Sequence, residues 1–155
     1  MKTLIFLSAL LLGLAACKNN PKEAGETDGI EAIAVEKPSP ILDLACYAYN
    51  KENNLISMEI TDLGEGVTAN LIYALDGKDR NIGTFQGNLA GDKLFGVYTF
   101  MSEGMDSKRE VAFQIVGNQL IEGYGELNEN GTAFVDRDKL SYTSTMPLTK
   151  TDCDR

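Results

Sequence analysis

From Ile41 onward, apolar and polar side chains alternate along most of the chain, and turns rich in glycine and asparagine separate the alternating runs. Alternation with a period of two is typical of a β-strand that turns one face toward a core and the other toward water. Ile56, Met58 and Ile60 show the pattern well, because a single polar residue separates each of them from the next. The pattern predicts one all-β domain that spans residues 41–155.

Eight such runs follow one another in this region. The turns between them include Asp76-Gly77 and Asn130-Gly131, whose residues tolerate positive φ. The expected strands are 45–50, 55–63, 67–75, 81–89, 93–101, 108–116, 119–127 and, with the weakest pattern, 139–145.

Short antiparallel strands joined by tight turns favour a small up-and-down barrel. In the runs 83–89 and 121–127, glycine alternates with other residues, and glycines on an inner face allow the sharp bends that a small barrel needs. The expected architecture is similar to the small members of the calycin group, which includes lipocalins and avidins. The Gly-x-Trp motif of lipocalins is absent, because the chain contains no tryptophan. A β-sandwich built from the same strands is the alternative.

The N-terminus carries a different signal. Lys2 precedes an uncharged run, residues 4–16, that is too short for the ~20 residues of a membrane-spanning helix and fits a secretory signal. Leu14-Ala15-Ala16-Cys17 resembles the lipobox of bacterial lipoproteins, in which signal peptidase II cleaves just before the cysteine. The resemblance implies a signal peptide at 1–16 and acyl chains such as palmitate on Cys17, which would anchor the mature chain to a membrane.

The same resemblance implies a place in the bacterial cell envelope. Lys18 is not the aspartate associated with inner-membrane retention in enteric bacteria, so the expected location is the outer membrane, facing the periplasm. Surface lipoproteins of Bacteroidota have a similar start, but they typically carry an acidic cluster soon after the cysteine. Residues 17–40 contain three of the four prolines and few large apolar side chains, which is typical of a flexible linker between an anchor and a folded domain.

Cys46 and Cys153 remain once one cysteine of the three is assigned to the anchor. Outside the cytoplasm such a pair favours a disulfide, and no C-x-x-C spacing or neighbouring histidine supports a metal or redox role. The first and last strands of a barrel are neighbours, so pairing of these two residues agrees with closure.

Composition excludes several functions. The net charge of −9 argues against a nucleic-acid partner, which requires clustered lysine and arginine. The absence of histidine excludes Ser-His-Asp and Cys-His catalysis and zinc sites that use histidine. The loop from Glu126 starts like an EF-hand, but Arg137 stands where a bidentate glutamate is required. We therefore expect no metal and no cofactor.

Carboxylates such as Glu110 and Glu122 keep a hydrolase open as an alternative, since a glycosidase needs two of them in one cleft. Nothing in the sequence distinguishes such a pair from a solvated surface, and we expect a protein that is not an enzyme.

Aromatic residues, among them Tyr73, Tyr98 and Phe113, are expected to fill the barrel or line its mouth. In the second case they would bind a small hydrophobic ligand, with Arg109 or Arg80 orienting a carboxylate. The sequence thus predicts a lipid-anchored binding module; the alternative is a protein that binds another envelope protein or inhibits an enzyme.

Overall fold

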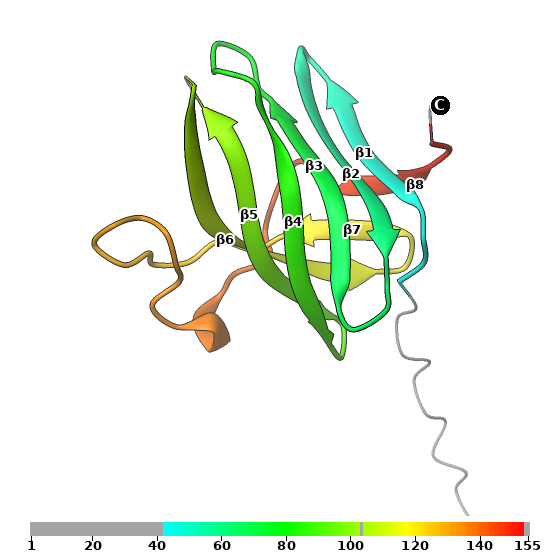
Figure 1. Ribbon diagram of the computed structural model, residues 1–155. Helices are drawn as coiled ribbons and strands as arrows, with labels where there is room; N and C mark the ends of the chain where they lie inside the picture. Colours follow the sequence, from blue (N-terminus) through cyan, green and yellow to red (C-terminus); the bar gives the residue numbers. More distant parts are fainter. Residues whose placement is uncertain (1–41, 103, 154–155) are drawn as a thin grey trace, which may run out of the picture. The chain divides into compact units, whose positions relative to one another are not determined.

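The computed structural model describes residues 42–102 and 104–153, and these residues form a closed antiparallel β-barrel (Figure 1). The strands follow one another around the barrel in chain order, and the last strand pairs with the first, which excludes the sandwich alternative. The strands are β1 (Cys46–Lys51), β2 (Asn54–Asp62), β3 (Val67–Ala74), β4 (Asn81–Ala90), β5 (Lys93–Ser102), β6 (Met105–Val116), β7 (Gln119–Glu122) and β8 (Leu148–Thr151).

The alternation in the sequence sets which side chains fill the barrel. On β2, Ile56, Met58 and Ile60 are buried, while Glu59 between them is exposed. The other long strands contribute inward residues in the same way, and together they form one apolar core. All strand pairs of this barrel lie between residues 46 and 151, so we expect the barrel to fold without the residues that precede it.

Glycines on β4 and β5 make room for a large aromatic ring. Phe85 is completely buried, and a Cβ at Gly87 or Gly96 would lie 2.6 or 2.5 Å from its Cζ atom. Real Cβ atoms do not approach another carbon so closely, so only glycine fits at these two positions. Glycine in the run 83–89 therefore shapes the barrel, as predicted, because it leaves room for the Phe85 ring.

The run 121–127 was expected to place its glycines on the inner face of a strand, and this expectation was wrong. β7 ends at Glu122 instead of continuing to residue 127, and its buried side chains are Leu120 and Glu122. Gly123 and Gly125 lie against other side chains: a Cβ on them would be 2.6 Å from the Tyr142 ring and 2.4 Å from a Leu140 methyl carbon. The glycines here let the segment after β7 pack closely.

The eighth strand was also predicted in the wrong place. Residues 139–145 form no strand; a short 3₁₀ helix, η1 (Arg137–Lys139), begins this region. β8 starts at Leu148, directly after Pro147, and Leu148 is fully buried in the core. Proline has no backbone donor for a strand ladder, so the strand begins after it.

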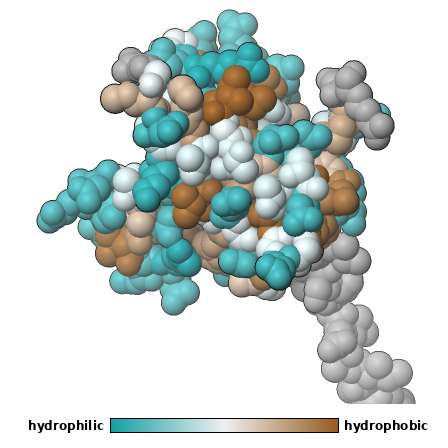
Figure 2. Space-filling view, in the orientation of Figure 1, coloured by the Kyte–Doolittle hydropathy of each residue, from teal (hydrophilic) through white to brown (hydrophobic). Residues whose placement is uncertain are grey.

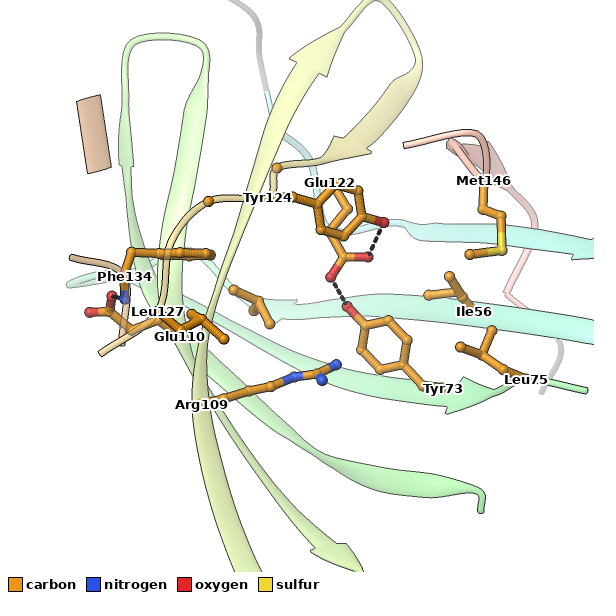
Figure 3. Close-up of a pocket in the computed structure, with 13 residues that line it drawn as sticks. Ile56, Tyr73, Leu75, Arg109, Glu110, Glu122, Tyr124, Leu127, Phe134 and Met146 are labelled. Carbon is orange, nitrogen blue, oxygen red and sulfur yellow. Dashed lines mark hydrogen bonds between the residues drawn. The ribbon is translucent and has the colours of Figure 1, made fainter. Parts of the chain in front are cut away.

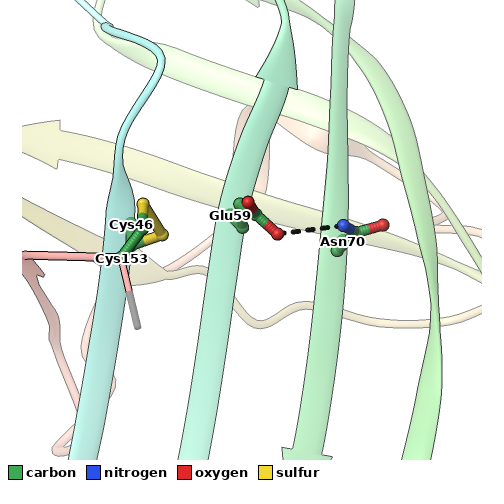
Figure 4. The surroundings of a disulfide bond; sticks show 4 residues. All are labelled: Cys46, Glu59, Asn70 and Cys153. Carbon is green, nitrogen blue, oxygen red and sulfur yellow. Dashed lines mark hydrogen bonds between the residues drawn. A yellow bond between two sulfur atoms is a disulfide. The ribbon is translucent and has the colours of Figure 1, made fainter. Parts of the chain in front are cut away.

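The Cys46–Cys153 disulfide ties down β8, the strand with the shortest pairing in the barrel (Figure 4). β8 pairs with β1 over three residues and with β7 over two, Gln119 to Thr149 and Leu120 to Leu148. The two cysteines are 5.2 Å apart between Cα atoms, and the bond joins the start of β1 to the residues just after β8. The predicted disulfide is therefore present in the structure.

Among the described residues, no helix has the length and apolar character that a membrane crossing requires. Cys17, the expected signal peptide at 1–16 and the expected linker at 17–40 lie outside the described residues.

Candidate functional site

The candidate site is a cavity of about 270 Å³ at the end of the barrel where β2 begins and β3 ends, and Figure 3 shows residues that line it. It exists because neighbouring strands differ in length. β6 pairs with β7 only over residues 113–116, so the preceding part of β6 has no strand partner on that side. The cavity is lined by Ile56, Tyr73, Leu75, Arg109, Glu110, Val111, Glu122, Gly123, Tyr124, Gly125, Leu127, Phe134 and Met146.

The segment that follows β7 forms one wall of the cavity. It leaves the barrel after Glu122 and passes beside the edge of β6 that has no strand partner (Figure 1). There the amide of Glu110 donates a hydrogen bond to the carbonyl oxygen of Thr132 (2.8 Å). The Glu110 side chain fixes the same segment: it accepts a hydrogen bond from the amide of Phe134 (2.9 Å) and forms an ion pair with Arg137. Partial burial raises the pKa of Glu110, but the hydrogen bonds from Arg137 and Phe134 outweigh it, and the net pKa is lowered.

Glu122 is the one charged residue buried among the described residues, with 8% of its surface exposed. The Tyr73 hydroxyl donates to its Oε1 atom at 2.8 Å, and the Tyr124 hydroxyl donates to Oε2 at 3.4 Å. Burial raises the pKa of Glu122, while the hydrogen bond from Tyr73, the charge of Arg109 and the bond from Tyr124 oppose that shift. Burial and the nearby carboxylate raise the pKa of Tyr73 well above its usual value, so Tyr73 keeps its proton and remains the donor.

Arg109 enters the cavity from β6 and lies against aromatic rings. The carbon of its guanidinium group is 5.1 Å from the centre of the Tyr73 ring and 5.8 Å from that of Phe100. Such contacts attract a cation to the face of a ring. The Nε atom of Arg109 is buried and has no hydrogen-bond partner among the described residues.

The four candidate ligand-binding residues divide into two pairs. Tyr73 and Arg109 line the cavity. Tyr98 and Phe113 are fully buried members of the core, and they are not among the residues that line it. Tyr98 stacks on Phe100 with ring centres 4.7 Å apart, and it is the cross-strand partner of Arg109. Arg80, the other arginine considered, is exposed just before β4 and also lies outside the lining.

Several lining residues were not singled out by the sequence. Tyr124, Phe134 and Met146 come from the irregular segment between β7 and β8, where no periodic pattern shows which side chains turn inward. Glu122 was named only as one member of a carboxylate pair. Its position two residues after the inward-facing Leu120 is the signal that could have placed it inside the barrel.

Glu110 and Glu122 both border the cavity, but their carboxylates do not face each other. In Figure 3 the Glu110 carboxylate points toward Phe134, whereas the Glu122 carboxylate lies between Tyr73 and Tyr124. Both oxygens of each carboxylate already accept hydrogen bonds. This arrangement does not favour the pair of facing carboxylates that a glycosidase uses.

A second hollow, of about 420 Å³, lies on the outer face of β1, β2 and β3 beside the disulfide. Glu59 borders it and accepts a hydrogen bond from Asn70 at 3.0 Å (Figure 4). Cys46, Cys153 and Glu59 bring potential metal ligands close together, but both thiols are used by the disulfide. Of these two hollows, the cavity at the barrel end is the one that combines apolar walls with a buried carboxylate.

No known protein family, no curated protein and no solved structure matches this chain.

Proposed function

We propose that this chain is a lipid-anchored envelope protein and that its barrel is a binding module for a small hydrophobic ligand. The observation that carries the proposal is the cavity at the barrel end. Ile56, Val111 and Met146 give it apolar walls, and it also holds a few fixed polar groups. Pockets that bind small molecules combine these two properties, since apolar contact gives affinity and a few polar groups orient the ligand.

The anchor is proposed from the N-terminal sequence. The short uncharged run and Leu14-Ala15-Ala16-Cys17 resemble the signal of bacterial lipoproteins. Two or three acyl chains on Cys17 would hold the protein at a membrane, and residues 18–40 would separate the barrel from it. The outer membrane, on its periplasmic side, is the proposed location. A disulfide-closed barrel is consistent with an oxidising compartment.

The test is native mass spectrometry of the protein purified from the cells that make it. The detergent used for extraction is not exchanged during purification. We expect the barrel to carry an additional small mass that is released by denaturation and is extracted into organic solvent. A bare protein mass in every preparation, together with no response to any hydrophobic probe, would contradict the binding function.

A second candidate function is supported by a surface feature. Ile82 and Met101 are cross-strand partners on the outer face, 51% and 55% exposed, and Met105 nearby is 68% exposed. Figure 2 shows a hydrophobic patch near the upper end of this face of the barrel. Contiguous exposed apolar surface often marks a protein interface. Crosslinking in intact cells would capture an envelope partner if this face binds one, and Met101→Lys should then prevent the capture.

A further inference from the structure

We propose that the cavity binds an amphiphile with a carboxylate head group, and that the guanidinium group of Arg109 holds this carboxylate. The inference rests on the ligand-binding function proposed above, and it adds the chemical class of the ligand.

The buried Nε donor of Arg109 is unsatisfied. Guanidinium groups usually form several hydrogen bonds, because each has five N–H donors in a fixed plane. In the described part of the chain, no carboxylate forms an ion pair with Arg109. Its Nε is shielded from solvent without an acceptor, and its guanidinium group lies against the rings of Tyr73 and Phe100. A buried donor without an acceptor is costly, so the site favours a ligand that supplies one.

Glu122 is the buried acid that lines the cavity. Each carboxylate oxygen of Glu122 already accepts a hydrogen bond from a tyrosine, which makes Glu122 less available to a cationic ligand. Among the residues that line the cavity, the buried polar atom that lacks a partner is a donor, the Nε of Arg109. Tyr98, on the strand next to Arg109, has a second buried hydroxyl without a partner, but it belongs to the core and does not line the cavity. A ligand that brings acceptor oxygens matches this imbalance.

The cavity also has an apolar wall. Val111 on β6 neighbours Arg109 on the same inward face, and Ile56 and Met146 lie across the cavity (Figure 3). An inorganic anion would leave this surface in contact with water, whereas an alkyl chain covers it, at about 0.8 kcal/mol per buried methylene. Planar guanidinium and carboxylate groups pair through two parallel hydrogen bonds, which identifies a carboxylate as the best matched head.

The experiment titrates ¹⁵N-labelled protein, residues 18–155, with three probes that share one chain: octanoate, 1-octanol and octyltrimethylammonium. We expect octanoate to bind at least about tenfold more tightly than 1-octanol, as a charged hydrogen bond requires. The cation should bind most weakly. The Nε–Hε resonance of Arg109 should shift with octanoate and not with 1-octanol, because only the carboxylate gives this donor a charged acceptor.

Arg109→Met keeps the aliphatic part of the side chain and removes the guanidinium group; it should reduce octanoate affinity to that of 1-octanol. Arg80→Met removes the same charge from an exposed position outside the cavity and should leave octanoate affinity unchanged. If Arg109→Met disturbs the fold, the Arg109 resonance of the wild-type protein still decides the question.

The outcomes separate the two proposals. Equal binding of octanoate and 1-octanol, or an Arg109 resonance that does not move at saturation, would overturn the carboxylate inference and leave a hydrophobic site intact. Failure of all three probes to bind would overturn the inference and, with a bare mass in native spectra, the binding function too.

Discussion

At the scale of single residues, Tyr98 and Tyr73 differ in one respect that matters for stability. Both are buried, but the Tyr73 hydroxyl donates to Glu122, whereas the Tyr98 hydroxyl has no partner among the described residues. Burial raises the pKa of Tyr98 to about 12, so the hydroxyl stays protonated and its hydrogen-bonding capacity goes unused. A buried polar group without a partner costs roughly 1–3 kcal/mol.

Tyr98→Phe is therefore expected to increase the free energy of unfolding by about 1 kcal/mol, because it removes the unpartnered hydroxyl and keeps the ring. Tyr73→Phe is the matched control with the opposite sign: it deprives a buried carboxylate of its closest donor and should destabilise by roughly 1–3 kcal/mol. Urea unfolding of the ligand-free protein measures both. A loss of stability in Tyr98→Phe would show that the hydroxyl has a partner.

Glu122 makes stability depend on pH in a defined direction. Its pKa is raised in the folded state, chiefly by burial, so the folded barrel holds the proton up to a higher pH than the unfolded chain does. The contribution of Glu122 to stability is thus complete below about pH 4.3, the ordinary pKa of a glutamate, and is lost as the pH rises through the folded value.

Glu122→Gln removes this titration while its amide oxygen can still accept from Tyr73. We expect the stability of Glu122→Gln relative to wild type to increase between pH 4 and the raised pKa and then to level off. Urea unfolding at several pH values checks this, with Glu65→Gln in the exposed β2–β3 turn as the control for removing one carboxylate. A relative stability that falls with pH would contradict the raised pKa.

At the scale of elements, the long strands, β1 and the start of β7 could be predicted from sequence, whereas the end of β7 and the position of β8 could not. β2 to β6 bury one face and expose the other over many residues, so their alternation is clear. β8 is four residues long, of which only Leu148 is fully buried, and such a strand leaves no periodic signal. It was therefore assigned to residues 139–145.

The same limit explains what was missed at the site. Tyr73 and Arg109 lie on long strands, where register predicts the direction of each side chain. The lining residues Phe134 and Met146 belong to a segment held by isolated contacts, such as the Glu110 bonds to Thr132 and Phe134. These contacts depend on the folded barrel and cannot be read from local pattern.

The disulfide supports the weakest part of the barrel. It closes a loop with a sequence separation of 107 residues, and β7–β8 pairing beside it is short. The double variant Cys46→Ala/Cys153→Ala should lose roughly 2–5 kcal/mol of unfolding free energy, because the unfolded chain is no longer constrained. Chemical denaturation measures the loss, and wild-type protein treated with reductant should match it. An unchanged midpoint would mean that strand pairing alone holds β8.

At the scale of the whole molecule, the proposed function requires a lipid anchor on Cys17. Cys17→Ser is expected to abolish metabolic labelling of the protein with palmitate. It should also leave the signal peptide uncleaved, which a larger band on a gel would show. Cys46→Ala is the matched control, since it removes a different cysteine and should retain the label. Labelling that persists in Cys17→Ser would contradict the anchor.

The central claim is that the cavity at the barrel end is where a small hydrophobic ligand binds. The chain contains no tryptophan, so a single one can be introduced as a reporter. Leu127 lines the cavity and is 43% exposed, whereas Val135 is 59% exposed and lies outside the lining. The most direct measurement is the fluorescence of Leu127→Trp and Val135→Trp titrated with an organic-soluble extract of the envelope. We expect a saturable blue shift in Leu127→Trp alone; an identical response of the two variants, or none in either, would contradict ligand binding in this cavity.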